Sequence, residues 1–149
     1  MAATLVEATD ALKATLEAAI NDVYVLARWD GTGDRYPLLV AMPPSIPAYH
    51  QTFRAQSNTI RTVDLELWLL SAPLDGGQIE TAQLDALPIC DWEGDQSVFA
   101  ALLGDPTLGG VVGECKVRSL ETLGAEEINL VKAWGAKFML TINLVPEAP

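Results

Sequence analysis

One segment of the 149-residue chain, Thr59 to Ala72, alternates apolar and polar side chains along most of its length. One side of the alternation holds Val63, Leu65, Leu67 and Leu69, together with Arg61, and the other side holds Thr62, Asp64, Glu66 and Trp68. Successive side chains of a strand point to opposite faces, so this pattern predicts a long strand with one covered face and one wet face. Such a strand is typical of an antiparallel sheet that packs on one side only.

The first segment of the chain has helical spacing. From Ala3 to Asn21 the apolar residues recur at steps of three and four, which places them on one stripe of a helix. Thr4 stands three residues before Glu7, and this capping-box pattern predicts where the helix begins. We therefore expect an amphipathic N-terminal helix of about 18 residues, roughly 27 Å long.

Two shorter helices are expected near the middle of the chain. Gln78 to Leu87 has approximate helical spacing. Gln96 to Leu103 follows Asp95, which is expected to cap it, and Gly104 should end it. The apolar residues of this second helix form a stripe: Val98, Phe99, Leu102 and Leu103.

Four further segments have the composition of strands: 23–29, 36–42, 111–119 and 136–145. Ala125 to Asn129 is expected to be a polar connection. Three prolines prevent regular structure after the second of these strands, so Pro43 to about Ser57 is expected to be a long surface loop. The order of elements predicts one α+β domain spanning residues 1–149. Its sheet should be mostly antiparallel or mixed, with the N-terminal helix and the two short helices packed on it.

Composition excludes several classes of protein. Half of the residues are hydrophobic and 19% are charged, so the chain can bury enough apolar surface to fold. The net charge of −11 argues against a protein that wraps nucleic acid, because such binding depends on Lys and Arg. No apolar run reaches the roughly 18 residues of a membrane span, and the first 20 residues lack the pattern of a secretory signal. Cys90 and Cys115 are expected to be free thiols in a reducing compartment.

The sequence offers little for catalysis. Gly104 to Gly109 has the outer glycines of a phosphate loop, but Gly110 and Val111 occupy the positions where Lys and Ser or Thr are required. His50 is the single histidine, and no Gly-x-Ser-x-Gly pattern of a nucleophile elbow occurs. We therefore expect neither an enzyme nor a cofactor.

An acidic trio, Asp91, Glu93 and Asp95, leaves one catalytic alternative open. Three carboxylates within five positions could hold a hard cation, although the spacing of a calcium loop is missing. A metal-assisted hydrolase built on these residues is therefore retained as a hypothesis.

Aromatic and basic residues provide candidates for protein contacts. The proline-rich loop and the start of the long strand supply most of them, and the polar side of that strand supplies the last: Tyr49, His50, Phe53, Arg54, Arg61 and Trp68. Trp68 is expected at an interface because of its position on the polar side. The other three tryptophans, Trp29, Trp92 and Trp134, are expected in the core.

The stretch from Asp95 to Val112 resembles a pattern in small neck and tail proteins of long-tailed bacteriophages. In that pattern a short helix of the Ser-Val-x-x-Ala-Leu kind, here Ser97 to Leu102, runs into Asp-x-Thr-Leu-Gly-Gly, here Asp105 to Gly110. The N-terminal helix, the Val-Asp-Leu-Glu-Leu-Trp-Leu-Leu strand from Val63 and the closing alternating segment from Ala136 agree with it. Over most of its length the chain is most similar to the tail-terminator family of siphoviruses.

The resemblance implies a structural virion protein. A tail terminator forms a homohexameric ring that caps the tail tube and joins it to the head–tail connector or stopper protein. Its partners would be copies of itself, the tail tube protein and the connector, and DNA would pass through the lumen without specific binding. The protein would reside in the neck of the virion, and in the host cytoplasm during assembly. Two alternatives remain. One is another neck role, head closure or tail completion, and the other is a small monomeric domain that binds a peptide or small ligand with the loop from Pro43 to Ser57.

Overall fold

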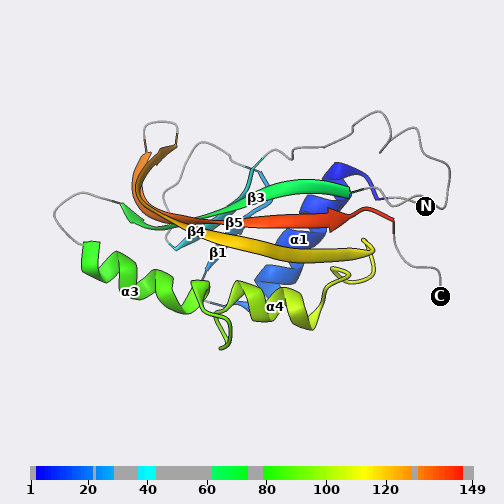
Figure 1. Cartoon of the computed structure of the whole chain (residues 1–149), viewed down its shortest axis with the longest axis horizontal. Helices are drawn as coiled ribbons and strands as arrows, with labels where there is room; N and C mark the ends of the chain where they lie inside the picture. The colour runs from blue at the N-terminus through cyan, green and yellow to red at the C-terminus, as the bar shows by residue number, and fades with distance from the viewer. Residues whose placement is uncertain are drawn as a thin grey trace.

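A computed structural model describes residues 3–21, 23–28, 37–42, 62–73, 79–128 and 131–145, with the backbone alone for 72–73, 79–83, 85, 122–128 and 131–134. Its elements, in chain order, are α1 Leu5–Ala19, β1 Tyr24–Leu26, β2 Leu38–Ala41, β3 Thr62–Pro73, α3 Ile79–Cys90, α4 Val98–Gly104, β4 Glu114–Ile128 and β5 Val131–Asn143. The strands form one sheet in the order β1-β2-β3-β5-β4, and the described helices lie on one side of it (Figure 1). None of these helices is long and apolar enough to cross a membrane.

The sheet is mixed, and the predicted α+β class is confirmed. β1 pairs with β2 in parallel, whereas the β2–β3, β3–β5 and β4–β5 pairs are antiparallel. The order leaves the three-residue β1 at one edge of the sheet and the 15-residue β4 at the other. Strands and helices do not alternate regularly, as a doubly wound parallel sheet would require.

The N-terminal helix begins as the sequence predicts. The Glu7 N–H donates to Thr4 Oγ1 at 3.1 Å, and the Thr4 N–H donates to Glu7 Oε1 at 3.2 Å. Both bonds of the capping box are therefore present. Leu12 and Leu16 point from this helix into the core, where both are fully buried.

The core lies between the helices and the sheet. The predicted alternation of β3 is confirmed, because its inward set is buried there: Val63, Leu65, Leu67 and Leu69. Three inward residues of β5 and Leu144, just beyond its end, are buried beside them: Phe138, Leu140 and Ile142 are the three from the strand. A smaller cluster, formed by Leu26, Leu38, Val40 and Leu70, lies on the other face of the sheet. β2 is consequently buried on both sides, with its four residues shared between the two clusters.

The cap of the second short helix differs from the prediction. The residue at the N-cap of α4 is Ser97, and its Oγ accepts a hydrogen bond from the Ala100 N–H at 3.1 Å. The same hydroxyl donates to the Asp91 carbonyl at 2.5 Å, which ties the start of α4 to the end of α3. Asp95 is exposed and precedes the cap by two residues. The prediction favoured Asp95 because Ser and Asp cap helices about equally well, and only the tie to Asp91 selects Ser97.

The last hairpin is longer than the sequence predicts. The expected polar connection at Ala125 to Asn129 is wrong for 125–128, because these residues continue β4 and pair with β5 as far as Ile128 opposite Val131. A hairpin ladder is held by backbone hydrogen bonds, so it can continue through residues whose side chains have no strand pattern.

The hairpin of β4 and β5 bends out of the sheet, away from α3 (Figure 1). The register of β4 shifts between Val117 and Ser119 and again between Thr122 and Gly124, and that of β3 shifts between Leu70 and Ala72. Bulges of this kind increase local twist and bend a strand. The end of the hairpin therefore projects beyond the helices and the core.

Candidate protein-contact surface

Five of the six predicted contact residues, Tyr49, His50, Phe53, Arg54 and Arg61, lie outside the described residues. Their role as interface residues stays a prediction.

Trp68 is half-buried on the face of the sheet that lacks helices. It stands opposite Val40 in the β2–β3 pair and packs against the smaller apolar cluster. Its indole N–H donates to Glu66 Oε2 at 2.8 Å, so its polar group already has a partner within the chain. The expected place of Trp68 on the polar side of the strand is confirmed, and its contact with another protein stays a prediction.

Cross-strand pairs neutralise the charges beside Trp68. Lys137 Nζ lies 3.6 Å from Glu66 Oε1 and 3.5 Å from Glu121 Oε2, and these carboxylates, Glu66 first, raise the pKa of the lysine. In the next row Asp64 Oδ1 accepts hydrogen bonds from Arg118 Nη1 at 3.2 Å and from Thr141 Oγ1 at 3.1 Å. This face of β3, β5 and β4 is therefore a network of internally paired side chains.

A groove with apolar walls lies on the other side of β4, between that strand and α4. We call it the α4–β4 groove. A hollow of about 320 Å³ at one end is lined by Glu114 and Lys116 of β4 and by six less polar residues: Phe99, Leu102, Leu103, Pro106, Cys115 and Val117. A second hollow of about 240 Å³ continues past Phe99 and Val117 toward the end of α3. Its other lining residues are Cys90, Asp91, Trp92, Arg118, Ser119, Leu120 and Phe138.

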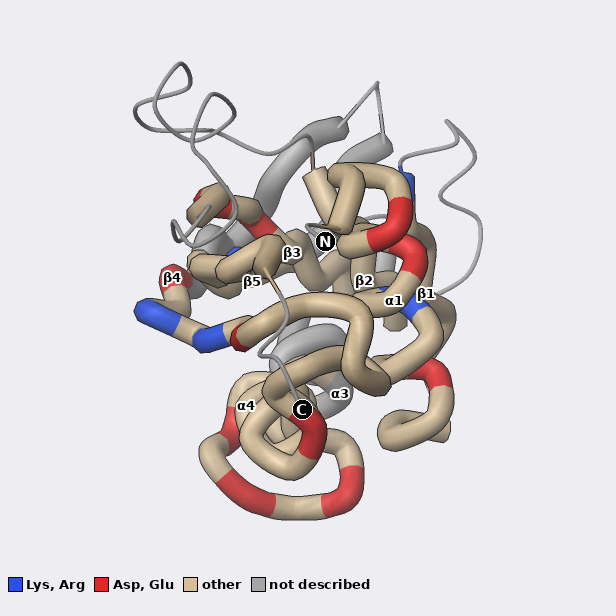
Figure 2. Tube along the Cα trace, turned by 90° about the vertical axis from the view of Figure 1, so that its right-hand side faces the viewer, with Lys and Arg blue, Asp and Glu red and all other residues tan. Residues whose placement is uncertain are grey.

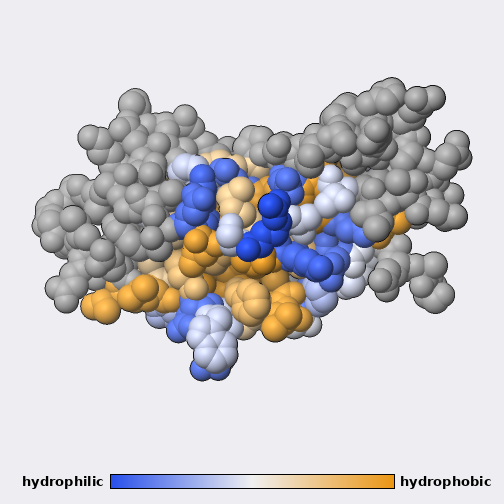
Figure 3. Space-filling model, viewed as in Figure 1, coloured by the Kyte–Doolittle hydropathy of each residue, from blue (hydrophilic) through white to orange (hydrophobic). Residues whose placement is uncertain are grey.

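Helix α4 is apolar on all sides, because its sequence is Val-Phe-Ala-Ala-Leu-Leu-Gly. Val98 and Leu102 face the core and are buried, whereas Phe99 is 37% and Leu103 69% exposed. The prediction that these four residues form one buried stripe is wrong, because only Val98 and Leu102 are buried and the other two are uncovered. Figure 3 shows a hydrophobic band in the lower half of the molecule, in the region of these elements.

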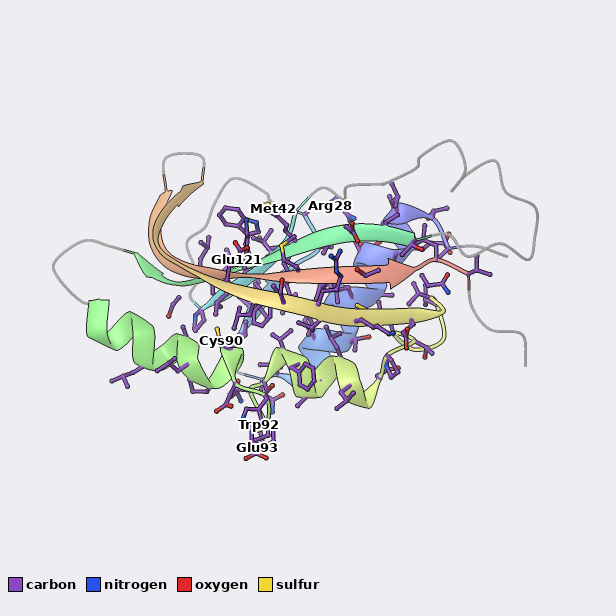
Figure 4. All side chains as sticks on the ribbon, in the orientation of Figure 1. Arg28, Met42, Cys90, Trp92, Glu93 and Glu121 are labelled. Carbon is purple, nitrogen blue, oxygen red and sulfur yellow. The ribbon has the colours of Figure 1, made fainter. Side chains whose placement is uncertain are left out.

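Trp92 stands at the end of the groove and corrects another prediction. The sequence placed it in the core, but its side chain is 70% exposed. It follows α3 directly, in a turn where its backbone N–H donates to Asp91 Oδ1 at 2.7 Å. Figure 4 shows Trp92 and Glu93 pointing away from the sheet, on the opposite side of it from Met42 and Glu121. Two leucines of α3, Leu84 and Leu87, are also more than half exposed.

The segment that resembles a phosphate loop forms the turn from α4 into β4. The Asp105 carboxylate accepts the Gly109 N–H at 3.0 and 3.1 Å from its two oxygens. The Pro106 carbonyl accepts the Cys115 N–H at 2.7 Å. Leu108 has a left-handed φ of 52° and is buried, so its side chain anchors the turn in the core. The segment is a structural turn that closes one end of the groove.

The groove offers no reactive thiol at neutral pH. Cys90 and Cys115 are both free, as expected. Burial raises the pKa of Cys90 to about 11, and burial together with the charge of Glu114 raises that of Cys115 to about 12. A thiol reacts as its thiolate, so both groups are suppressed as nucleophiles.

The acidic trio does not converge on a point in space. Asp91, Glu93 and Asp95 are exposed on the turns between α3 and α4. Within the described ranges, no three His, Cys, Asp or Glu side chains are placed to hold a metal ion. The geometry therefore gives no support to the hydrolase hypothesis.

Comparison with protein-family models gives no match to this chain, and comparison with curated proteins gives none either. The interpretation of its function therefore rests on the chemistry of its surfaces. Sequence reasoning did not predict the groove. The sequence of α4 does contain one signal for it. A seven-residue helix without a polar side chain cannot bury every face against one sheet, so one apolar face must remain uncovered.

Proposed function

We propose that this chain is a structural subunit of the neck of a long-tailed bacteriophage, a tail terminator that forms a ring on the end of the tail tube and joins it to the head–tail connector. The observation that carries the proposal is the α4–β4 groove. Its α4 wall and the turn that closes it are formed by Ser97 to Gly110, the segment that resembles phage neck proteins.

The area of uncovered apolar side chain supports a role in assembly. Six large apolar residues on α3, α4, β4 and the turn after α3 are more than a third exposed: Leu84, Leu87, Trp92, Phe99, Leu103 and Leu120. Uncovered apolar surface of this kind is typical of a site where another protein binds. A soluble protein gains stability by covering such a surface with another protein.

The bent end of the β4–β5 hairpin gives each subunit an arm. Because it projects beyond its own core, it can pack on the body of a neighbour (Figure 1). A contact between two different surfaces, repeated around an axis, closes a ring when the rotation permits, and six copies is the number that the family resemblance implies.

The acid excess suits a ring through which DNA passes without binding. Each copy carries a net charge of −11. Phosphates are repelled by carboxylates within about one Debye length, roughly 8 Å at physiological salt, so acidic residues near the lumen would prevent adhesion.

Mass photometry and negative-stain imaging of the purified protein, alone and with tail tubes, test the proposal. We expect rings of about six subunits, or density on tube ends. A shortened variant lacks the four residues of two cross-strand pairs, Glu126–Ala133 and Glu127–Lys132. Deleting two residues from each strand preserves the alternation of both. The shortened variant should remain folded and lose ring formation. Monomers of the unmodified chain under both conditions, with bare tubes, would contradict the proposal.

The groove also favours a second candidate, a monomeric peptide-binding domain. An apolar hollow of about 320 Å³ beside a strand edge is large enough for one or two side chains of a peptide. A stable monomer that binds a peptide in this groove, and never attaches to tubes, would select this candidate.

A further inference from the structure

We infer that the α4–β4 groove receives a basic amphipathic segment of a different protein and not a second copy of this chain. The inference rests on the proposed function, because it names the class of partner for the surface that carries it. The argument comes from charge complementarity between the groove and its occupant.

The chain is strongly asymmetric in charge around the groove. From Ile79 to Cys115, the segment that forms α3, α4 and the turns beside them, there is no Lys or Arg, and the segment carries these carboxylates: Glu80, Asp85, Asp91, Glu93, Asp95, Asp105 and Glu114. Figure 2 shows acidic residues along the turns on both sides of α4, with the nearest basic residues on β4. The α4 side of the groove is therefore acidic.

The described bases are already paired within the chain. Each has a carboxylate partner at 3.6 Å or less: Lys13 with Glu17, Arg28 with Asp10, Lys116 with Glu114, Arg118 with Asp64 and Lys137 with Glu66. None of these bases forms an ion pair with Asp91, Glu93, Asp95 or Asp105. The described part of a second copy would thus bring only paired bases and further carboxylates to an acidic rim, and like charges at an interface are costly.

The β4 wall disfavours the addition of a strand. The N–H of Cys115, near the start of β4, donates to the Pro106 carbonyl and is therefore not free to pair with an added strand. A bulge follows between Val117 and Ser119. Lys116 and Arg118 are exposed on the same stretch. Bulges and charges at a sheet edge oppose continuous pairing with another strand.

A helix fits the groove better than a strand. The seven residues from Glu114 to Leu120 span about 23 Å of strand. An amphipathic helix of about 15 residues has that length, and it contacts a groove through side chains without needing the strand's backbone groups. Its apolar side would cover Phe99 and Leu103. Its Lys and Arg would lie near the turns at the two ends of α4, beside Asp91 and Asp95 at one end and Asp105 at the other.

Two 18-residue peptides, one of Leu and Lys and one of Leu and Glu with the same amphipathic pattern, probe the groove directly. Anisotropy of the labelled peptides measures their binding to the full chain. The Leu/Lys peptide should bind, more weakly as salt increases, and the Leu/Glu peptide should bind at least tenfold more weakly. Equal binding of the two peptides would overturn the inference.

Leu103→Glu is the variant that separates groove binding from general attraction. Leu103 is 69% exposed, so the change should leave the fold intact, as circular dichroism and urea unfolding can verify. The new carboxylate would strengthen non-specific attraction of a Lys peptide, whereas loss of the apolar contact predicts at least tenfold weaker binding. Val6→Glu, at a 58% exposed position in the first turn of α1, is the matched control and should bind like the unmodified chain.

Ring formation by these variants distinguishes the inference from the proposed function. If Leu103→Glu forms rings but no longer attaches to tubes or connectors, both are supported. If Leu103→Glu loses its rings while Val6→Glu retains them, the occupant is a second copy and the inference is wrong. If neither the unmodified chain nor the variants form rings, but the Leu/Lys peptide still binds more tightly than the Leu/Glu peptide, the ring proposal fails. The inference that the groove receives a basic amphipathic segment then stands.

Discussion

Gly135 of β5 lies so close to Leu69 of β3 that a Cβ atom on the glycine would stand 2.6 Å from the Leu69 carbonyl oxygen. Gly135 pairs with Leu70 on one side and with Gly124 on the other, and each of these partners adjoins a register shift. The absence of a side chain at this position allows β5 to approach β3 closely where the hairpin bends.

Gly135→Ala should therefore destabilise the fold. The added methyl group must push against backbone, which cannot rotate away as a side chain can, and overpacking of this kind costs about 1–3 kcal/mol. Urea unfolding followed by circular dichroism measures the change. Gly104→Ala is the control, because a Cβ there meets nothing within 4 Å and the residue lies in α4. It should leave stability unchanged or raise it by up to about 1 kcal/mol.

Ser97→Ala should lower the free energy of unfolding by about 1 kcal/mol or somewhat more. It removes the α4 cap and the hydrogen bond to the Asp91 carbonyl together, and loss of a cap alone costs about 0.5–2 kcal/mol. Asp95→Ala should change stability by less than about 0.5 kcal/mol, since this residue is exposed and outside the cap. Equal losses in the two variants, measured by thermal or urea unfolding, would contradict the assignment of Ser97.

Leu102 and Leu103 are neighbours with opposite expected roles. Leu102 is 2% exposed, so Leu102→Ala should lower the free energy of unfolding by about 2–5 kcal/mol through lost burial and a cavity. Leu103→Ala should change stability by less than about 0.5 kcal/mol and weaken attachment to a partner. Unfolding curves and tube-binding assays on both variants separate a role in the core from a role in contact. A large stability loss at Leu103 would show that its side chain supports the fold.

The two cysteines should react slowly in the folded protein. At pH 8 a thiol with a pKa of about 11 holds roughly a hundredfold less thiolate than one at 9.0, and burial further restricts access. Labelling with a chromogenic disulfide reagent should be slow in buffer and fast in urea, with Cys115 slower than Cys90 because its pKa is higher still. Rapid labelling of either residue without urea would show that its burial is incomplete.

The same pKa shifts give a pH dependence of stability with a definite sign. The folded state holds thiol protons that the unfolded state releases near pH 9. The contribution of the two thiols is therefore constant below that pH and declines as pH rises from about 9 toward 11. Cys90→Ser should reduce the decline when urea midpoints are compared between pH 8 and 10. An unchanged slope would contradict the raised pKa of Cys90.

Local patterns were sufficient for the parts of the fold that depend on one element. The alternation of β3 and the capping box of α1 are confirmed, because each arises from neighbours two to four residues apart. The prediction at Asp95 was wrong because the competing cap, Ser97, is selected by a bond to the end of another helix. Trp92 was wrongly placed in the core because apolar character alone does not show which side of a turn faces the sheet.

The sequence by itself determined that this chain forms an α+β domain, since the periods of its apolar residues fix which faces must be buried. Tertiary structure alone decided that β4 is an edge strand, that α4 has one face without a cover, and that the two form a groove with an acidic rim. The physical reason is that periodicity records how each element is buried, whereas a surface between elements depends on their order in the sheet, which is set by contacts between residues far apart in the chain.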